Sequence, residues 1–298
     1  MSFVIYYPTT DTARQHLHPK KETSLKKPHH TMMLPKISLF FLAINAASAT
    51  RVVVSITLPT TGANALMHDY DDVTEVTTNI IIENTDLTSL ACWFPSLVLV
   101  TGNVQITNNG QLRTMDASFQ QLETVTGYLD IFGNDVLVEL GTTLPFPGGA
   151  GLVTGYVSIY KNPKLVSLGS ALRGLVTVTG YCSVYGNAAL GNLGTAFTDL
   201  ETVTGYLSIH NNGALTALGE TAFGNLDTVT GYVSIYANPV LASLGTAFGN
   251  LGTVTGYFSV ANNPALRCTT AVAGAHGRFV TQTVPCRLTA PPTGPPAQ

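Results

Sequence analysis

Residues 226–241 read LDTVTGYVSIYANPVL, and close copies of this stretch recur along the chain. The V-T-G-Y motif at its centre appears six times, at intervals of 28, 25, 25, 26 and 25 residues, with its tyrosine at Tyr128, Tyr156, Tyr181, Tyr206, Tyr232 and Tyr257. Weaker copies begin near residues 53, 78 and 100. A fixed period of this length is typical of stacked repeats, and it predicts about nine coils between residues 51 and 266.

Alternation within each copy predicts how a coil turns. Apolar or small residues at Val203, Gly205, Leu207 and Ile209 alternate with Thr202, Thr204, Tyr206, Ser208 and His210. This period of two predicts one strand with an inward and an outward face. The apolar spacing then lengthens to three or four in residues 212–226, as expected where a chain turns corners. Since one coil cannot bury its own apolar stripe, we expect a mainly β, parallel β-solenoid with rungs about 4.8 Å apart.

An asparagine recurs where each predicted strand ends. It stands six residues after the tyrosine position and three before a leucine, at Asn109, Asn134, Asn162, Asn187, Asn212, Asn238 and Asn263. A short amide side chain at a turn can satisfy backbone groups of its own coil and of the next one. The spacing therefore predicts a structural asparagine ladder.

The combined pattern L-x-x-V-x-G-x-Φ-x-I-x-x-N-x-x-L-x-x-L resembles the receptor L-domain family over about residues 75–268. These leucine-rich-repeat-like solenoids occur in insulin-type and epidermal-growth-factor-type receptor ectodomains and in fungal cell-wall proteins. The resemblance implies extracellular recognition, or a wall or adhesion role, with no catalytic residues to carry over. With it, the expected fold is a right-handed parallel β-solenoid of about nine 25-residue leucine-rich-repeat-like coils.

The first 49 residues are predicted to target the chain rather than to fold with it. An apolar run at 37–44 followed by Ala-Ser-Ala at 47–49 predicts a signal peptide of about residues 32–49, with cleavage before Thr50. An uncleaved membrane anchor is the alternative, but it needs about 20 apolar residues. We therefore expect a secreted or extracellular protein, placed at the cell surface or wall.

The rest of the chain divides into three predicted segments. These are a repeat solenoid at 50–266, a C-terminal cap at 267–288 and a Pro-rich disordered tail at 289–298. No second long apolar run occurs in the sequence, so no membrane span is expected.

Of the four cysteines, two are predicted to form a disulfide and two are predicted to stay reduced. Cys182 takes the inward position that Leu207 fills in another copy, so a small buried thiol is expected. Cys92 lies about three or four rungs away, beyond the roughly 7 Å Cα separation that a disulfide allows. Cys268 and Cys286 bracket the end of the last coil, where they are predicted to form a capping disulfide.

The charge content limits the classes of partner. Only 10% of residues are charged, against roughly 25% in a typical soluble domain. The net charge is −3, and residues 50–298 alone hold 8 basic and 15 acidic residues, a net charge of −7. A basic surface that follows nucleic-acid phosphates is therefore excluded.

Candidate reactive groups are few. An acidic cluster surrounds His68 at Asp69, Asp71, Asp72 and Glu75, but it lacks the spacing of a calcium loop and is interpreted as a solvated segment. Ser208 and His210 share a predicted strand face without a carboxylate to orient the imidazole. Asp130, Asp135 and Glu139 share one coil, which leaves a polysaccharide-active enzyme as an alternative. We expect no enzyme activity, no metal and no cofactor.

The outward strand face is the predicted ligand-binding surface. Its aromatic positions are Tyr156, Tyr181, Tyr206, Tyr232 and Tyr257 in one column and Tyr160, Tyr185, His210 and Tyr236 in another. Threonine and serine columns are expected to lie beside them on the same broad sheet.

Two interpretations of this face stay open. Aromatic residues in register can simply stabilise stacked strands, or they can recognise an extracellular glycan or protein. We predict a recognition or adhesion module. The first alternative is a purely structural wall or matrix protein. The second is an ice-binding solenoid with T-x-T ladders, and the third is a polysaccharide-active enzyme. The oligomeric state stays open.

Overall fold

The computed structural model describes residues 51–219 and 221–266. The predicted signal peptide and Thr50 start, the cap at 267–288 with its Cys268–Cys286 disulfide, and the tail at 289–298 lie outside the described residues.

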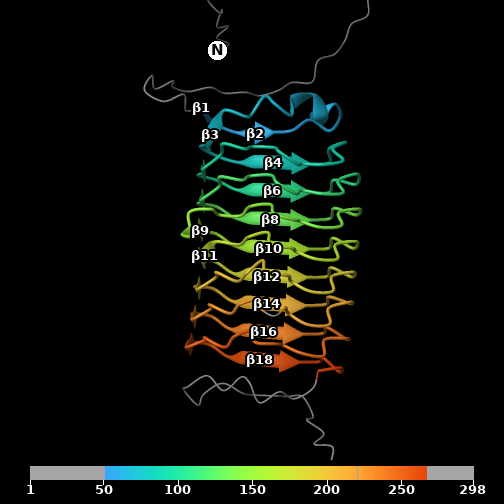
Figure 1. Cartoon of the computed structure of the whole chain (residues 1–298), viewed down its shortest axis with the longest axis vertical. Coiled ribbons are helices and arrows are strands. Elements are labelled where there is room, and N and C mark those ends of the chain that lie inside the picture. Colours follow the sequence, from blue (N-terminus) through green and yellow to red (C-terminus); the bar gives the residue numbers. More distant parts are fainter. Residues whose placement is uncertain (1–50, 220, 267–298) are drawn as a thin grey trace, which may run out of the picture. The chain divides into compact units, whose positions relative to one another are not determined.

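The described chain winds through two nine-stranded parallel sheets, to which each coil contributes one strand apiece (Figure 1). The first sheet contains β1 (Arg51–Val53), β3 (Val73–Val76), β5 (Leu99–Val100), β7 (Thr124–Val125), β9 (Gly151–Val153), β11 (Leu175–Val178), β13 (Thr202–Val203), β15 (Thr228–Val229) and β17 (Thr253–Val254). The second sheet contains β2 (Ile56–Thr57), β4 (Ile80–Glu83), β6 (Val104–Thr107), β8 (Leu129–Phe132), β10 (Val157–Tyr160), β12 (Cys182–Tyr185), β14 (Leu207–His210), β16 (Val233–Tyr236) and β18 (Phe258–Ala261).

Successive coils stack in register along the second sheet, and the first sheet has register shifts at Arg51/Val52 and at Leu175/Thr177. In the second sheet, Leu207 pairs with Cys182 on one side and with Val233 on the other. Eight turns are complete within the described residues, and β17 and β18 represent a ninth. The mainly β, parallel solenoid is confirmed, and about nine coils was a slight overstatement.

Helix is nearly absent from the part of the chain that the structure describes. One short 3-10 helix, η1 (Ala63–Leu66), follows β2 in the first coil. Within 51–219 and 221–266, no helix has the length and apolar character needed to cross a membrane.

The predicted single strand over 202–210 is wrong, because the chain bends between β13 and β14. The bend falls at Gly205, whose N–H donates to the Gly180 carbonyl oxygen of the preceding coil at 2.8 Å. A Cβ at this position would lie 2.6 Å from the same oxygen, so glycine is required where the two backbones approach so closely. The glycine of the V-T-G-Y motif is therefore a corner residue.

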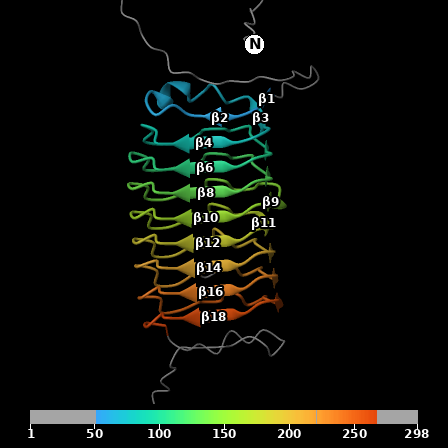
Figure 2. The same cartoon turned by 180° about the vertical axis from the view of Figure 1, so that it is seen from behind.

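This corner separates surfaces that the sequence placed on one sheet. The strands of the first sheet lie along one side of the coil stack, whereas those of the second sheet cross its face, as both views show (Figures 1 and 2). Thr202 belongs to the first sheet, and Ser208 and His210 belong to the second. The broad face of combined threonine, tyrosine and serine columns does not exist as predicted.

The core fills the space inside the coils. The inward positions Leu207 and Ile209 are fully buried, as the alternation predicted. The segment after the second-sheet strand adds a spine of stacked phenylalanines, in which the centroids of Phe197 and Phe223 lie 5.0 Å apart. Cys182 is buried and unpaired as predicted, and Cys92 is exposed and unpaired.

The asparagine ladder is confirmed. The Asn212 Oδ1 accepts a hydrogen bond from the Asn187 backbone N–H of the preceding coil at 3.2 Å. Its Nδ2 donates to the Val184 carbonyl oxygen at 3.0 Å and to the Asn238 Oδ1 of the next coil at 3.4 Å. Each amide thus joins neighbouring coils through backbone groups that the turn would otherwise leave unpaired.

Candidate functional site

Two aromatic columns run along the outer side of the second sheet. The first column contains Tyr128, Tyr156, Tyr181, Tyr206, Tyr232 and Tyr257, with ring centroids 4.5–4.8 Å apart and interplanar angles of 1–4°. The second column contains Phe132, Tyr160, Tyr185, His210 and Tyr236, with centroids 4.5–4.7 Å apart and angles of 6–15°. The structure therefore brings all nine predicted aromatic residues together.

Two members of the columns were missing from the predicted site. Tyr128 begins the first column and Phe132 begins the second. The V-T-G-Y motif already marked Tyr128, and the four-residue interval between the columns could have identified Phe132.

Stacking changes what the columns offer to a ligand. Each interior ring lies between two other rings, so its π-faces are occupied within the protein. The ring edges and phenol hydroxyl groups are what the interior of each column can present to a partner. Tyr257, at the C-terminal end of the first column, is 52% exposed and stacks on Tyr232 alone among the described rings.

A row of serines lies between the two columns. Ser158, Ser183 and Ser208 are only 3%, 4% and 6% exposed, although they belong to the outward phase of their strands. Ser234 and Ser259 are more exposed, so the row opens toward the C-terminal coils. The aromatic columns therefore cover most of this row.

Burial keeps the phenol groups of Tyr156, Tyr160 and Tyr181 protonated and uncharged at neutral pH. Burial is the main cause that raises the pKa of Tyr160 and of Tyr181 to about 12, and nearby Asp130 and neighbouring tyrosines add to it. The same causes raise the pKa of Tyr156 further. Burial also lowers the pKa of His210, so its imidazole is neutral within the second column. Each phenol can both donate and accept a hydrogen bond.

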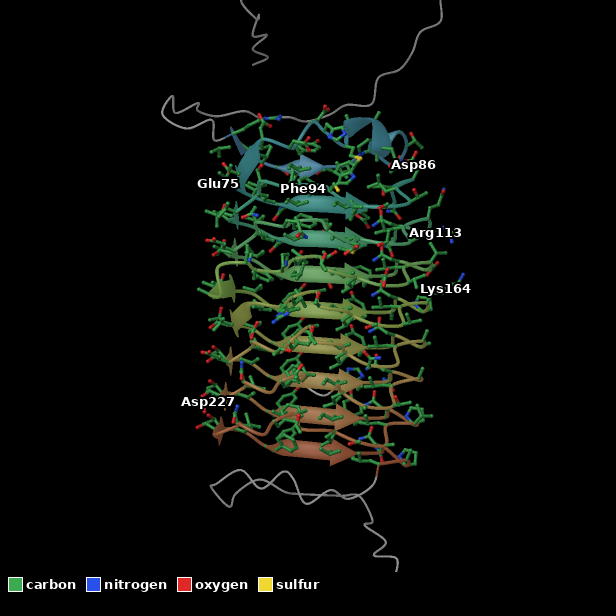
Figure 3. All side chains as sticks on the ribbon, viewed as in Figure 1. Glu75, Asp86, Phe94, Arg113, Lys164 and Asp227 are labelled. Atoms are coloured by element: carbon green, nitrogen blue, oxygen red, sulfur yellow. The ribbon has the colours of Figure 1, made fainter. Side chains whose placement is uncertain are left out.

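Charged side chains flank this face. Figure 3 shows Glu75 and Asp227 along one side of the coil stack and Asp86, Arg113 and Lys164 along the opposite side. On the second sheet itself, Glu83 at the end of β4 is exposed, and the following coils carry the aromatic columns and the serine row.

Asp130 is the charged residue within the serine row. It pairs in register with Gln105 on one side and Ser158 on the other. It is only 8% exposed, and its Oδ1 has no hydrogen-bond partner. Burial raises the pKa of its carboxyl group to about 6. The sequence predicted that the Asp130 side chain points outward from its strand, and the structure shows that it is nevertheless buried on that outer side.

The other candidate reactive groups do not converge. Asp135 and Glu139 are exposed in the segment after β8, whereas Asp130 is buried within β8 and its Oδ1 has no hydrogen-bond partner. Ser208 lies in the serine row, whereas His210 stacks between Tyr185 and Tyr236.

Two carboxylates of the N-terminal acidic cluster have ion-pair partners. Asp72 accepts from Arg51 at 2.9 Å, and His68 contacts Asp71 at 2.9 Å. The described ranges contain no group of three or more His, Cys, Asp or Glu residues arranged to hold a metal ion.

Corner threonines are also committed to the fold. The hydroxyl group of Thr179 donates to the Thr154 carbonyl oxygen of the preceding coil at 2.6 Å. In the same way, the hydroxyl group of Thr154 donates to the Thr126 carbonyl oxygen, and that of Thr126 donates to the Thr101 carbonyl oxygen. The backbone N–H of Thr204 donates to the Val178 carbonyl oxygen at 2.9 Å, so the corner threonines extend the first-sheet ladder by one residue. The T-x-T pairs therefore belong to the first sheet, separate from the tyrosine columns, and ice binding stays an untested alternative.

The fold and the two columns define the class: a parallel β-solenoid repeat protein whose second sheet carries stacked aromatic columns. Comparisons of the chain with protein-family models, with curated proteins and with solved structures found no match.

Proposed function

We propose that this solenoid is a secreted or cell-surface recognition and adhesion module that binds an extracellular glycan or protein through the outer face of its second sheet. The observation that carries the proposal is the regular array of neutral phenol hydroxyl groups along the two aromatic columns. This role agrees with the resemblance to the receptor L-domain family.

Preorganisation supports recognition by this face. Each interior ring is held by neighbours at 4.5–4.8 Å, so little side-chain freedom remains to be lost on binding. Tyrosine also combines apolar area with a hydroxyl group that can donate or accept. A partner rich in hydroxyl or amide groups therefore complements these columns.

A purely structural wall or matrix protein is the second candidate. The stacked interior rings favour it, because their faces stabilise neighbouring coils whether or not a ligand binds. The two functions predict different effects of removing tyrosines.

The test is a double variant, Tyr206→Ala with Tyr232→Ala, in the full chain. Binding to an array of extracellular glycans and proteins should weaken at least about 30-fold, which corresponds to about 2 kcal/mol. The matched control is Thr202→Ala with Thr228→Ala, on the same two coils but on the first sheet. It should leave binding unchanged, and melting curves of both variants monitor folding.

Two outcomes would contradict recognition by this face. The double tyrosine variant could retain full binding, or the unchanged chain could bind nothing on the array. Either result leaves the structural role as the better explanation.

A further inference from the structure

The two aromatic columns end on different coils. The first column continues to Tyr257 in the last described coil, whereas the second ends one coil earlier at Tyr236. The register partner of Tyr236 on β18 is Ala261, which carries only a methyl group. The last described coil therefore lacks one ring of the second column.

Within residues 51–219 and 221–266, one π-face of Tyr236 has no ring stacked on it. Tyr236 stacks on His210 on one side, and no other described ring contacts its opposite face. Successive rungs are about 4.8 Å apart, which matches the 4.5–4.8 Å spacing of the stacked rings. The space beside Ala261 thus has the depth of one further ring.

The opposite end of the columns differs in its burial. There the register partner of Phe132 is Thr107, which is only 3% exposed, and the hydroxyl group of Tyr128 accepts a hydrogen bond from the Gln105 side-chain amide. The register partner of Tyr236, Ala261, is partly exposed, so within the described residues the second column is more open at its C-terminal end.

The surroundings of the vacant position are neutral and polar. Tyr257 is 52% exposed beside it, and Ser259 lies between Tyr257 and Ala261 on the same coil. Ser234 adds a second hydroxyl group from the preceding coil. An aromatic face carries negative charge density that attracts C–H groups, and the hydroxyl groups can bond a ring's polar edge.

We propose that this slot, lined by Tyr236, Ala261, Tyr257 and Ser259, binds one pyranose ring of a neutral, β-linked glycan. The sugar ring takes the place of the missing aromatic ring and stacks on the free face of Tyr236. The inference rests on the proposed function, since it names the glycan class and the position at which that surface binds it.

Calorimetric titration of the full chain with cellohexaose tests the slot. The all-equatorial β-linked glucose units present flat C–H faces, whereas α-linked maltohexaose curls and serves as the control sugar. We expect cellohexaose to bind at least tenfold more tightly than maltohexaose.

The decisive variant is Ala261→Tyr, which fills the slot with the ring that the preceding coils already carry. It should weaken cellohexaose binding at least tenfold while the melting temperature stays equal or rises. The matched control, Thr253→Tyr, adds the same ring to the same coil on the first sheet and should bind as the unchanged chain does.

Cellohexaose binding that survives Ala261→Tyr would overturn the slot, and so would the absence of cellohexaose binding by the unchanged chain. The array experiment separates the two proposals in either case. If the Tyr206 and Tyr232 double variant still abolishes array binding, the second-sheet surface stands and only the slot fails. If the double variant binds the array as well as the unchanged chain does, both proposals fail.

Discussion

Asp130 occupies the position on its second-sheet strand that serine occupies in the five following coils. The substitution Asp130→Ser therefore introduces the residue that the repeat already carries at this position. Its carboxyl group is 8% exposed, with one oxygen unpartnered, and burial raises its pKa from 3.8 to about 6. The folded state therefore holds a proton that the unfolded chain releases between these two pH values. The contribution of the Asp130 carboxyl group to stability is fully present below pH 3.8 and is lost as the pH rises through about 6.

The size of this effect follows from the shift in the Asp130 pKa. The rise of the Asp130 pKa from 3.8 to about 6 sets an upper limit of roughly 3 kcal/mol, and solvent that still reaches the carboxyl group reduces the effect to about 1–2 kcal/mol. The serine variant should therefore be more stable than the unchanged chain by about 1–2 kcal/mol at pH 7.5. With roughly 2–4 °C per kcal/mol, the melting temperature should rise by roughly 2–8 °C.

Thermal melts of both chains from pH 4 to pH 8 measure the effect. The advantage of the serine variant should shrink toward pH 4, where the buried carboxyl group is protonated. Asp135→Ser, in an exposed position of the same coil, is the matched control and should show no comparable trend. A serine variant that is no more stable at pH 7.5, or whose advantage does not vary with pH, would refute the burial of an ionisable group at this position.

Three further substitutions test the coil geometry by thermal or urea denaturation. Gly205→Ala places a Cβ 2.6 Å from a backbone oxygen of the preceding coil and should strongly destabilise the fold. Gly110→Ala is the control, because a Cβ there has no atom within 4 Å, and it should have little effect. Equal effects of the two variants would argue against the corner at Gly205. Asn212→Ala leaves buried backbone groups unpaired and should cost roughly 1–3 kcal/mol for each one, so a neutral effect would contradict the ladder. Leu207→Ala removes a fully buried side chain and should cost roughly 2–5 kcal/mol, so a loss below 1 kcal/mol would contradict the inward phase.

The repeat period and the apolar phase were enough to predict the coils, the inward Leu207 and the asparagine ladder. The corner at Gly205 was missed because a residue without a side chain fits the inward phase of an alternating strand as well as it fits a bend. Its close contact with Gly180 depends on the neighbouring coil, which the local pattern does not describe.

Nine of the eleven residues in the two aromatic columns were predicted, but their stacking was not. Alternation placed Tyr206 and His210 outward, but it carries no information about ring tilt, so the face-to-face stacking could not be foreseen. The burial of Asp130 was missed for a related reason. Asp130 is only 8% exposed and interacts electrostatically with Tyr156 and Tyr160 of the two columns, whereas outward position alone suggests solvation.

The central claim is that the outer face of the second sheet binds the partner. Its most direct test is a nuclear magnetic resonance titration of the full chain, labelled on tyrosine rings and threonine methyl groups, with the tightest binder from the array. The proposal predicts that ring signals of the two aromatic columns shift, while methyl signals of Thr202, Thr228 and Thr253 on the first sheet stay in place. Shifts confined to the threonine methyl groups, with unchanged tyrosine rings, would contradict it.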